Sequence, residues 1–285
     1  MPLVRTADLI AEARSEGAAV CAFNVITVEH AEAIAAGAEA AGRPAVLQIS
    51  ENAVKFHGGR LGPIAAATAA VAAASTARLS LHLDHVEDEA LLRQAHAHGF
   101  TSVMFDASKL PYGDNVKATA EAVRWGHERD IWVEAELGRV GGKAGDAHTP
   151  GVRTDPAEAA AYVADTGVDA LAVAVGSTHA MTARTATLDH ALITALRDAV
   201  PVPLVLHGSS GVPDTELRRA VAAGMTKINV GTALNKAFTG AVRAFLEAHP
   251  STTDPRKYLT PARAAMTETV AGFLRAVSVS GGNSG

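Results

Sequence analysis

The amino-acid sequence predicts an α/β fold, namely a single-domain (β/α)8 barrel of the TIM type. Short apolar runs alternate along the chain with longer, alanine-rich segments of helical periodicity, and eight such runs can be counted. Strands and helices in this rhythm indicate a parallel sheet with helices outside it. The chain has 285 residues, of which 48% are hydrophobic, and one such barrel typically needs about 250 residues. Length and rhythm together favour one closed barrel.

The predicted strands are apolar runs bounded by polar or turn-forming residues, as is typical of buried strands. They span residues 18–24, 44–50, 78–84, 101–106, 131–137, 169–175, 202–207 and 226–230. A doubly wound open sheet is the alternative architecture, because it shows the same alternation. That fold would more often carry a glycine-rich dinucleotide loop after its first strand, and Phe23-Asn24-Val25 contains no glycine. The barrel is therefore the preferred prediction.

The predicted helices begin after capping residues and end before glycines. Thr154-Asp155-Pro156 combines an N-cap with a proline suited to a first turn, and Gly42 and Gly167 stand where helices should end. The helices span residues 6–16, 28–41, 61–75, 87–98, 115–130, 156–166, 188–200, 213–223, 232–248 and 261–276. We expect the barrel domain to cover residues 1–279, with a mobile lid at 138–153 and a flexible tail at 280–285.

The composition argues against several classes of function. The formal net charge is −5, and basic residues neither cluster nor alternate with aromatic ones, so we expect no nucleic-acid partner. The alanine-rich runs are shorter than the roughly 20 residues of a membrane-spanning helix, and the N-terminus does not resemble a signal peptide. The single cysteine, Cys21, excludes an intramolecular disulfide and fits a reducing compartment. We therefore expect a cytoplasmic protein with no membrane partner.

Polar side chains gather where the predicted strands end, which in this fold is where active sites lie. Asp84 and His85 end the third strand, and His179 and His207 follow the sixth and seventh. A single histidine at a strand end is more often structural, but three of them predict convergence on one site. Three imidazoles with an open fourth position are typical of a catalytic zinc site. The other polar residues at strand ends are Asn24, Ser50, Asp106, Glu134, Glu136 and Asn229.

Two loops rich in small residues predict a phosphate site. Gly208-Ser209-Ser210-Gly211 follows the seventh strand, and Asn229-Val230-Gly231-Thr232 follows the eighth and opens a helix. Barrels commonly bind phosphate with backbone N–H groups at these two loops and at a helix N-terminus. Small residues can also simply form tight turns, but the presence of both loops at the expected places favours phosphate binding.

A metal beside a phosphate suggests chemistry on a phosphorylated carbonyl compound. A divalent ion can polarise a ketone and stabilise the ene-diolate that forms when a proton or a carbon–carbon bond is lost. Asp84, next to a predicted ligand, would exchange a proton with the substrate hydroxyl. Lys227 begins its predicted strand, and no other lysine stands in an apolar setting near a strand end, so a Schiff-base mechanism is disfavoured.

At this point the chain resembles the class II, metal-dependent ketose-bisphosphate aldolases. The resemblance runs from residue 22 to residue 259, and its motifs are LHLDH at 81–85, VEAELG at 133–138, VLHGSSG at 205–211 and NVGT at 229–232. The length and the last motif are similar to the short, tagatose-bisphosphate branch. The resemblance implies reversible cleavage of fructose- or tagatose-bisphosphate to dihydroxyacetone phosphate and an aldehyde, in carbohydrate metabolism and glycolysis. It also implies a homodimer or homotetramer.

The resemblance assigns roles to individual residues. His85, His179 and His207 would hold Zn²⁺, Asp84 would be the proton donor, and Asp106 and Glu136 could hold a second or displaced metal ion. A monovalent cation, Na⁺ or K⁺, would lie near the phosphate. The residues expected to bind the substrate and its phosphate are Asn24, Ser50, Gly176, Ala180, Gly208, Ser209, Ser210, Asn229, Val230, Gly231 and Thr232.

The sequence departs from the family pattern at three places. Lys143-Ala144 replaces a pair of acids, one of them the proposed base on dihydroxyacetone phosphate, so Asp146 becomes the candidate base. Ala180 replaces a glycine, and Thr27 stands where asparagine is common. These departures leave open an aldolase for 5-dehydro-2-deoxyphosphogluconate, from inositol catabolism. A non-catalytic phosphosugar-binding subunit is a further alternative, which Asp84 and the three histidines disfavour. A metal-dependent hydrolase would need a His-x-His pair where Asn24 stands.

Overall fold

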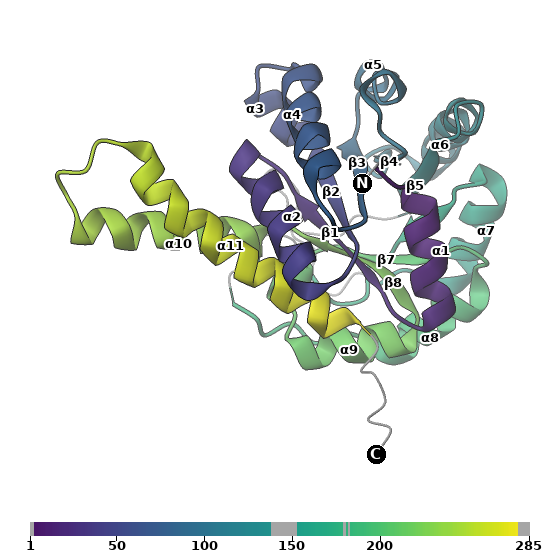
Figure 1. The fold of residues 1–285 in the computed structure, drawn as a ribbon. Coiled ribbons are helices and arrows are strands. Elements are labelled where there is room, and N and C mark those ends of the chain that lie inside the picture. Colours follow the sequence, from purple (N-terminus) through teal and green to yellow (C-terminus); the bar gives the residue numbers. More distant parts are fainter. Residues whose placement is uncertain (1–2, 138–152, 179–180, 182, 279–285) are drawn as a thin grey trace.

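The protein forms a closed barrel of parallel strands, as predicted from the alternation of strand and helix (Figure 1). The structure is a computed structural model that describes residues 3–137, 153–178, 181 and 183–278. Neighbouring strands pair in chain order, and β8 pairs with β1 to close the sheet. The strands are β1 (Val20–Asn24), β2 (Ala45–Ser50), β3 (Leu79–Val86), β4 (Ser102–Phe105), β5 (Trp132–Glu136), β6 (Ala170–Ala172), β7 (Leu204–Leu206) and β8 (Met225–Val230).

Helices surround the barrel, and most lie where periodicity places them. They are α1 (Thr6–Glu16), α2 (Val28–Ala41), α3 (Glu51–Phe56), α4 (Leu61–Ala74), α5 (Glu89–Leu92), α6 (Tyr112–His127), α7 (Pro156–Thr166), α8 (His190–Ala199), α9 (Asp214–Ala223), α10 (Thr232–Ala248) and α11 (Pro255–Val277), with 3₁₀ turns η1 (His96–His98) and η2 (Ser209–Gly211). In the part of the chain that is described, no helix is long and apolar enough to cross a membrane.

Three helix predictions need correction. The single helix expected at 87–98 is wrong, because the chain breaks after α5 and tightens into η1, which ends at Gly99 in a left-handed conformation. Helix α3 was not predicted: it follows β2 without a loop, and Ser50 caps it by accepting from the N–H of Ala53 at 3.2 Å. Helix α11 begins at Pro255 after the cap Asp254, so Pro261 lies inside the helix instead of starting it.

The interior of the barrel has an apolar end and a polar end. Leu9 and Ile10 of α1 pack against inward-facing strand residues such as Trp132 and close the amino-terminal end of the barrel. Beyond this apolar layer the interior holds buried polar side chains, which begin with Ser80 and Ser102 near the strand starts and continue with His82, Glu134 and Lys227. Because the helices cover the outside of the sheet, the predicted site residues can converge only at this polar end.

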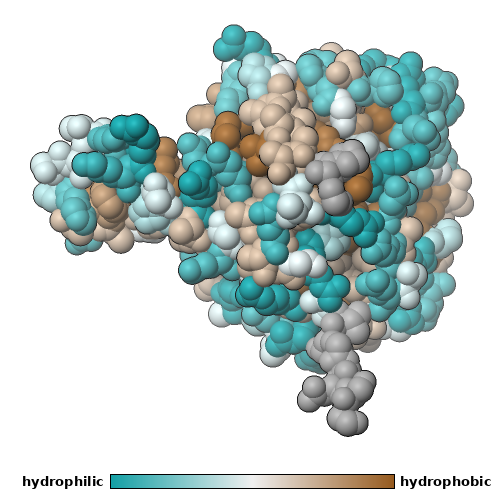
Figure 2. Space-filling view, viewed as in Figure 1, coloured by the Kyte–Doolittle hydropathy of each residue, from teal (hydrophilic) through white to brown (hydrophobic). Residues whose placement is uncertain are grey.

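Helices α10 and α11 form a hairpin that stands away from the barrel (Figure 1). Leu234 is the one fully buried residue of α10, all of which is described, whereas the second half of α11 packs against the barrel through residues such as Val270. Figure 2 shows the tip of this hairpin as an arm with hydrophilic and hydrophobic residues side by side. The expected lid, apart from Arg153, and the expected tail at 280–285 lie outside the described residues.

Candidate active site

A β-bulge in β3 turns Asp84 and His85 toward the same end of the barrel. Leu83 pairs with Val103 and Val86 with Phe105, so Asp84 and His85 together oppose the single residue between those partners on β4. The backbone of His85 has a φ of 95°, which is strained for a residue with a side chain and costs about 1–3 kcal/mol. The bulge breaks the alternation that would otherwise direct adjacent side chains to opposite faces.

Three side chains form a possible metal site at this end of the barrel. His85 of β3, Glu136 of β5 and His207, which follows β7, each offer one ligand atom within 4.8 Å of the others. Nδ1 of His207 lies 3.3 Å from Oε2 of Glu136, and the two imidazole rings are 4.8 Å apart between centroids. Two imidazoles and a carboxylate suit Zn²⁺ or a similar divalent ion. The predicted third imidazole, His179, lies outside the described residues.

Asp106 contacts the imidazole of His85. Oδ2 of Asp106 accepts a hydrogen bond from Nδ1 of His85 at 2.9 Å, while Oδ1 accepts from the backbone N–H and hydroxyl of Ser108. A proton held on Nδ1 leaves the lone pair of Nε2 for a metal. Asp106 therefore fits an orienting role beside the metal cluster.

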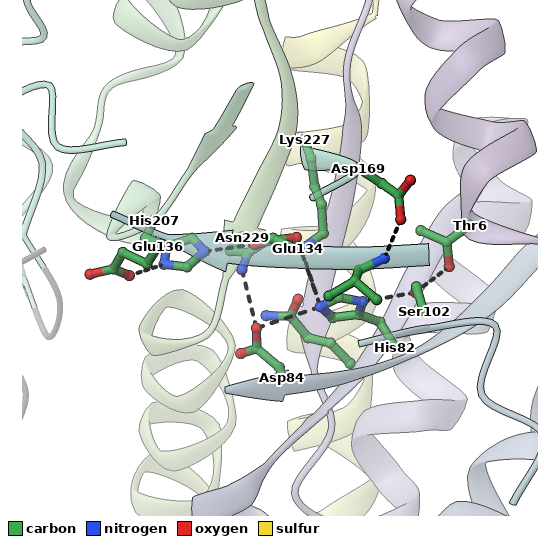
Figure 3. A network of polar contacts seen from close by, with 12 residues as sticks. Thr6, His82, Asp84, Ser102, Glu134, Glu136, Asp169, His207, Lys227 and Asn229 are labelled. Carbon is green, nitrogen blue, oxygen red and sulfur yellow. Dashed lines mark hydrogen bonds and ion pairs between the residues drawn. The ribbon is translucent and has the colours of Figure 1, made fainter. Parts of the chain in front are cut away.

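Behind the metal cluster, a buried carboxylate lies between a histidine and a lysine (Figure 3). Oε1 of Glu134 lies 3.1 Å from Nε2 of His207, and Oε2 lies 2.7 Å from Nζ of Lys227. All three side chains have no exposed surface. Lys227 is the third residue of β8, so it does not begin its strand as predicted. Lys227 is engaged by Glu134 and does not line the cleft, so it is not placed to form a Schiff base with a substrate.

These charges shift the pKa values of the cluster. Burial raises the pKa of Glu134, but Lys227 and His207 hold it well below its usual range. Burial lowers the pKa of His207, but hydrogen bonds to Glu134 and Glu136 outweigh that effect and raise the pKa to about 9 in the metal-free protein. Burial raises the pKa of Asp84, and nearby His85 and Lys227 lower it overall. Asp84 is therefore ionised at neutral pH and can accept a proton.

A cleft of about 490 Å³ opens above these residues and reaches the N-terminus of α10. Its lining includes Asp84, His85, Asn24, Ser50, Gly208, Ser210, Asn229, Gly231 and Thr232. The first N–H groups of a helix have no partner within that helix and attract anions. Ser210 connects the loop after β7 to this helix end, because its Oγ accepts a hydrogen bond from the N–H of Ala233 at 3.0 Å. The cleft thus joins a metal cluster to an anion-binding helix end.

Two glycines allow close contacts around the part of the cleft beside the N-terminus of α10. Gly208 has a φ of 70°, and a Cβ at this position would lie 2.5 Å from the carbonyl oxygen of Thr178. A Cβ at Gly231 would lie 3.1 Å from the side-chain amide of Asn24. Any larger residue at Gly208 would therefore displace the loop that follows β6.

Several residues that were predicted to bind the substrate or its phosphate lie elsewhere in the structure. Ser209 is buried and its hydroxyl donates to the carbonyl oxygen of Asn229, so it ties the two small-residue loops together. Val230 is buried in β8. Gly176 has a φ of 120°, and its backbone lies close to the carbonyl oxygen of Thr187. None of these three lines the cleft. The predicted substrate contact Ala180 and the predicted base Asp146 lie outside the described residues.

The cleft also contains polar residues that the sequence reasoning missed. Lys55 pairs with Glu51 at 2.6 Å and Lys109 with Glu87 at 2.8 Å, so two ion pairs flank the opening. The missed lining residues are Gln48, Glu51, Asn52, Lys55, Glu87, Lys109 and Asn235. Only Gln48 gave a signal, as a polar residue inside an apolar strand. The others lie on loops and on short or peripheral helix turns, where polar residues are ordinary.

Comparison with known proteins gives a consistent family match. The family model described as "Fructose-bisphosphate aldolase class-II" matches residues 4–282. The chain is 39% identical over 283 residues to "Fructose-bisphosphate aldolase" of Geobacillus stearothermophilus, with 99% of each chain covered. It is also 39% identical over 278 residues to "Probable fructose-bisphosphate aldolase" of Bacillus subtilis, covering 96% of this chain and 97% of that one. The crystal structure of the YdjI aldolase from Escherichia coli superimposes with a TM-score of 0.84, at 30% identity and 98% coverage of both chains.

Proposed function

Because the chain belongs to the class-II fructose-bisphosphate aldolase family, we propose that it reversibly cleaves a ketose 1,6-bisphosphate to dihydroxyacetone phosphate and an aldehyde. The observation that carries the proposal is that one cleft is lined by Asp84, by the N-terminus of α10 and by His85, which forms the metal cluster with Glu136 and His207. A proton acceptor, a metal site and an anion site are the three parts that such a cleavage requires.

The proposed cofactor is Zn²⁺, held by His85, His207 and His179, with Glu136 as a ligand of the same or of a displaced ion. When bound, such an ion supplies Lewis-acid polarisation of the substrate ketone. The donor set supports this assignment, because neutral imidazoles are preferred zinc ligands. Asp106 was expected to hold a second metal ion, and its contact with His85 instead supports the orienting role.

Asp84 is the proposed acid–base residue at the carbon–carbon bond. Its ionised carboxylate lines the cleft beside His85, and Nδ2 of Asn229 lies 3.5 Å from its Oδ1. In the cleavage direction it would take the proton of the substrate hydroxyl, and in the reverse direction it would return that proton. Asp146 is proposed, on the sequence alone, as the base that acts on dihydroxyacetone phosphate.

The proposed binding site for the phosphate of the dihydroxyacetone half is the start of α10. Gly208, Ser210, Gly231 and Thr232 surround that helix end and supply backbone N–H groups. A Na⁺ or K⁺ ion near this phosphate is proposed from the family resemblance. At the other end of the cleft, Lys55 and Lys109 could approach the charged end of the aldehyde half.

We also propose that the enzyme is a cytoplasmic homodimer or homotetramer. The α10–α11 hairpin supports self-association, because Phe245 and Leu246 of α10 are only half-buried on an arm that stands clear of the barrel. The buried thiol of Cys21 is compatible with a reducing compartment. Sedimentation of the purified protein would test the assembly.

A panel of candidate substrates tests the proposed activity. Fructose 1,6-bisphosphate, tagatose 1,6-bisphosphate and 5-dehydro-2-deoxyphosphogluconate would each be incubated with the zinc-loaded enzyme, and dihydroxyacetone phosphate release measured. A ketose bisphosphate should give the highest kcat/KM, and a strong chelator should abolish release until zinc is restored. Full activity in chelator, with borohydride trapping of the substrate on the enzyme, would overturn the metal mechanism. Release from none of the three would favour the non-catalytic subunit.

A further inference from the structure

The interior of the barrel carries a chain of directed hydrogen bonds that ends on the metal cluster (Figure 3). Ser102 donates from Oγ to Oγ1 of Thr6 at 2.6 Å, so the contact of 2.8 Å between Ser102 and Nδ1 of His82 must use a proton of the imidazole. Nε2 of His82 then carries a lone pair and faces Nζ of Lys227 at 3.5 Å. Burial and the charge of Lys227 lower the pKa of His82 to about 3, which keeps this ring neutral.

Lys227 has protons to donate and no lone pair, so it can be satisfied only by acceptors. It takes two of them: Nε2 of His82 and Oε2 of Glu134, the latter at 2.7 Å. Glu134 is thereby held ionised, with Oε1 directed at Nε2 of His207, 3.1 Å away. An ionised carboxylate accepts hydrogen bonds and donates none, so Nε2 of His207 must carry a proton. Metal binding is left to Nδ1, which lies on the side of Glu136.

We propose that Lys227 and Glu134 are a positioning pair that fixes His207 in its metal-binding tautomer, with the proton on Nε2 and the lone pair on Nδ1. The inference rests on the proposed function, because it assumes that His207 is a metal ligand. Stability alone does not account for such a pair: a fully buried ion pair can often be replaced by apolar residues at no loss of stability. Its geometry instead specifies which nitrogen of one imidazole faces the cluster.

Glu134→Gln tests the pair because an amide has one acceptor and one donor end. Lys227 would claim the amide oxygen, which leaves the NH₂ group facing Nε2 of His207. That nitrogen would then have to accept, and the ring proton would move to Nδ1, where it blocks metal binding. We expect zinc affinity, measured by competition with a chromogenic chelator, to fall about 10–100-fold, as is usual when a partner of a metal ligand is lost.

Removing the lysine should reverse this effect. In Lys227→Met/Glu134→Gln no ammonium claims the amide oxygen, so the amide can turn it toward His207 and accept from Nε2. Zinc affinity should return to within about threefold of the parent, because Nδ1 recovers its lone pair. A merely structural role for Glu134 predicts the opposite, since the double variant disturbs the core more than the single one. Recovery of affinity on adding the second substitution is therefore the distinguishing result.

The chain offers a matched control at a distance from the cleft. Glu216 also joins a histidine to a cation, with Nε2 of His190 at 2.9 Å and an Arg219 nitrogen at 2.7 Å. Glu216→Gln makes the same chemical change and should leave zinc affinity unchanged. The ¹⁵N shifts of the His207 ring, recorded without metal above the pKa of His207, give a second readout. They should place the proton on Nε2 in the parent and on Nδ1 in Glu134→Gln.

The outcomes separate the inference from the proposed function. A parent protein that binds no zinc would refute the metal site itself. A parent that binds zinc, with equal affinity in Glu134→Gln or with no recovery in the double variant, would refute the positioning pair alone. If Glu134→Gln does not fold, Lys227→Met/Glu134→Gln can be compared with Lys227→Met/Glu134→Met. Only the amide can accept from Nε2 of His207, so the first should bind zinc at least tenfold more tightly, and equal affinities would overturn the proposal.

Discussion

Nδ1 of His85 lies 2.9 Å from Oδ2 of Asp106, and this contact joins the bulge of β3 to the loop that follows β4. The strained backbone of His85 directs its side chain into the cleft, while Asp106 decides which nitrogen of the ring holds the proton. Glu134 plays the corresponding part for His207 from the interior of the barrel. The two imidazoles are thus oriented by different carboxylates, and through opposite ring nitrogens.

Asp106→Ala should therefore weaken zinc binding without abolishing it. Loss of the acceptor frees the His85 ring to rotate and to take either tautomer, which should lower zinc affinity about 10–100-fold. His85→Ala, which removes the ligand atom, should lower the affinity much further. Chelator competition on both variants measures the difference. If Asp106→Ala loses zinc as completely as His85→Ala, Asp106 is a ligand and not an orienting residue.

His207 and Ser210, which lie three residues apart after β7, should have separable functions. His207→Ala should lose zinc and most of kcat, whereas Ser210→Ala should keep zinc and mainly raise KM, because a phosphate contact is made in both ground and transition states. Ser210→Ala also removes the acceptor for the N–H of Ala233, so a loss of about 0.5–2 kcal/mol in the free energy of unfolding is expected as well. Zinc content, steady-state kinetics and denaturant unfolding measure the three effects. Equal zinc loss in both variants would contradict this division.

The fold could be predicted because its signals are local. Alternating apolar runs and alanine-rich segments, with caps such as Asp155 before Pro156, are properties of neighbouring residues. The helix at 87–98 was predicted as continuous because its periodicity was read without the turn that Gly99 ends. Helix α3 was missed because it follows β2 with no loop between them to mark its start.

Of the candidate site, only the residues at strand ends and in the loops that follow them could be predicted from the sequence. Asp84, His85 and His207 stand at such ends, and Gly208 and Gly231 mark the expected loops, so position along the chain was enough to select them. The pairing of Glu134 with Lys227 depends on the register of strands that are distant in sequence, and on which side chains face the barrel axis. Lys227 was also placed at a strand start, which hid its inward direction.

Zinc affinity should increase with pH across the neutral range. In the metal-free protein the pKa of His207 is raised to about 9, so zinc must displace a proton at lower pH. Affinity should therefore rise by up to about tenfold per pH unit toward pH 9 and then level off. Chelator competition at several pH values, with a correction for the chelator's own protonation, measures the slope. A constant affinity between pH 7 and pH 9 would show that His207 is already neutral.

The stability of the metal-free protein should follow the opposite trend. The pKa of His207 is raised above its ordinary value of 6.5 in the folded state, so the folded state binds this proton more tightly than the unfolded state. Its contribution to the free energy of unfolding is fully present below about pH 6.5 and is lost as the pH rises through about 9. Thermal unfolding of the chelated protein should show this loss, and His207→Ala should reduce the slope.

The last prediction separates the two proton transfers of the reaction. General acid–base steps are worth about 10²–10⁴-fold, so Asp84→Ala should reduce carbon–carbon cleavage by that order. It should retain zinc, because His85, Glu136 and His207 are unchanged. Exchange of the dihydroxyacetone phosphate C–H proton with solvent is a different step and should survive in this variant. In Asp146→Ala that exchange should instead fall, if Asp146 has replaced the missing acid pair.

Both rates can be measured on the same samples, with cleavage followed by dihydroxyacetone phosphate release and exchange followed by NMR in deuterated solvent. Asn229 lies 3.5 Å from Asp84, so Asn229→Ala is a useful comparison: it should weaken substrate binding while the carboxylate stays in place. Exchange at the parent rate in Asp146→Ala would assign the base elsewhere. Loss of exchange and cleavage together in Asp84→Ala, with zinc still bound, would mean that Asp84 serves both steps, because Asp146 is intact in that variant and should otherwise sustain the exchange.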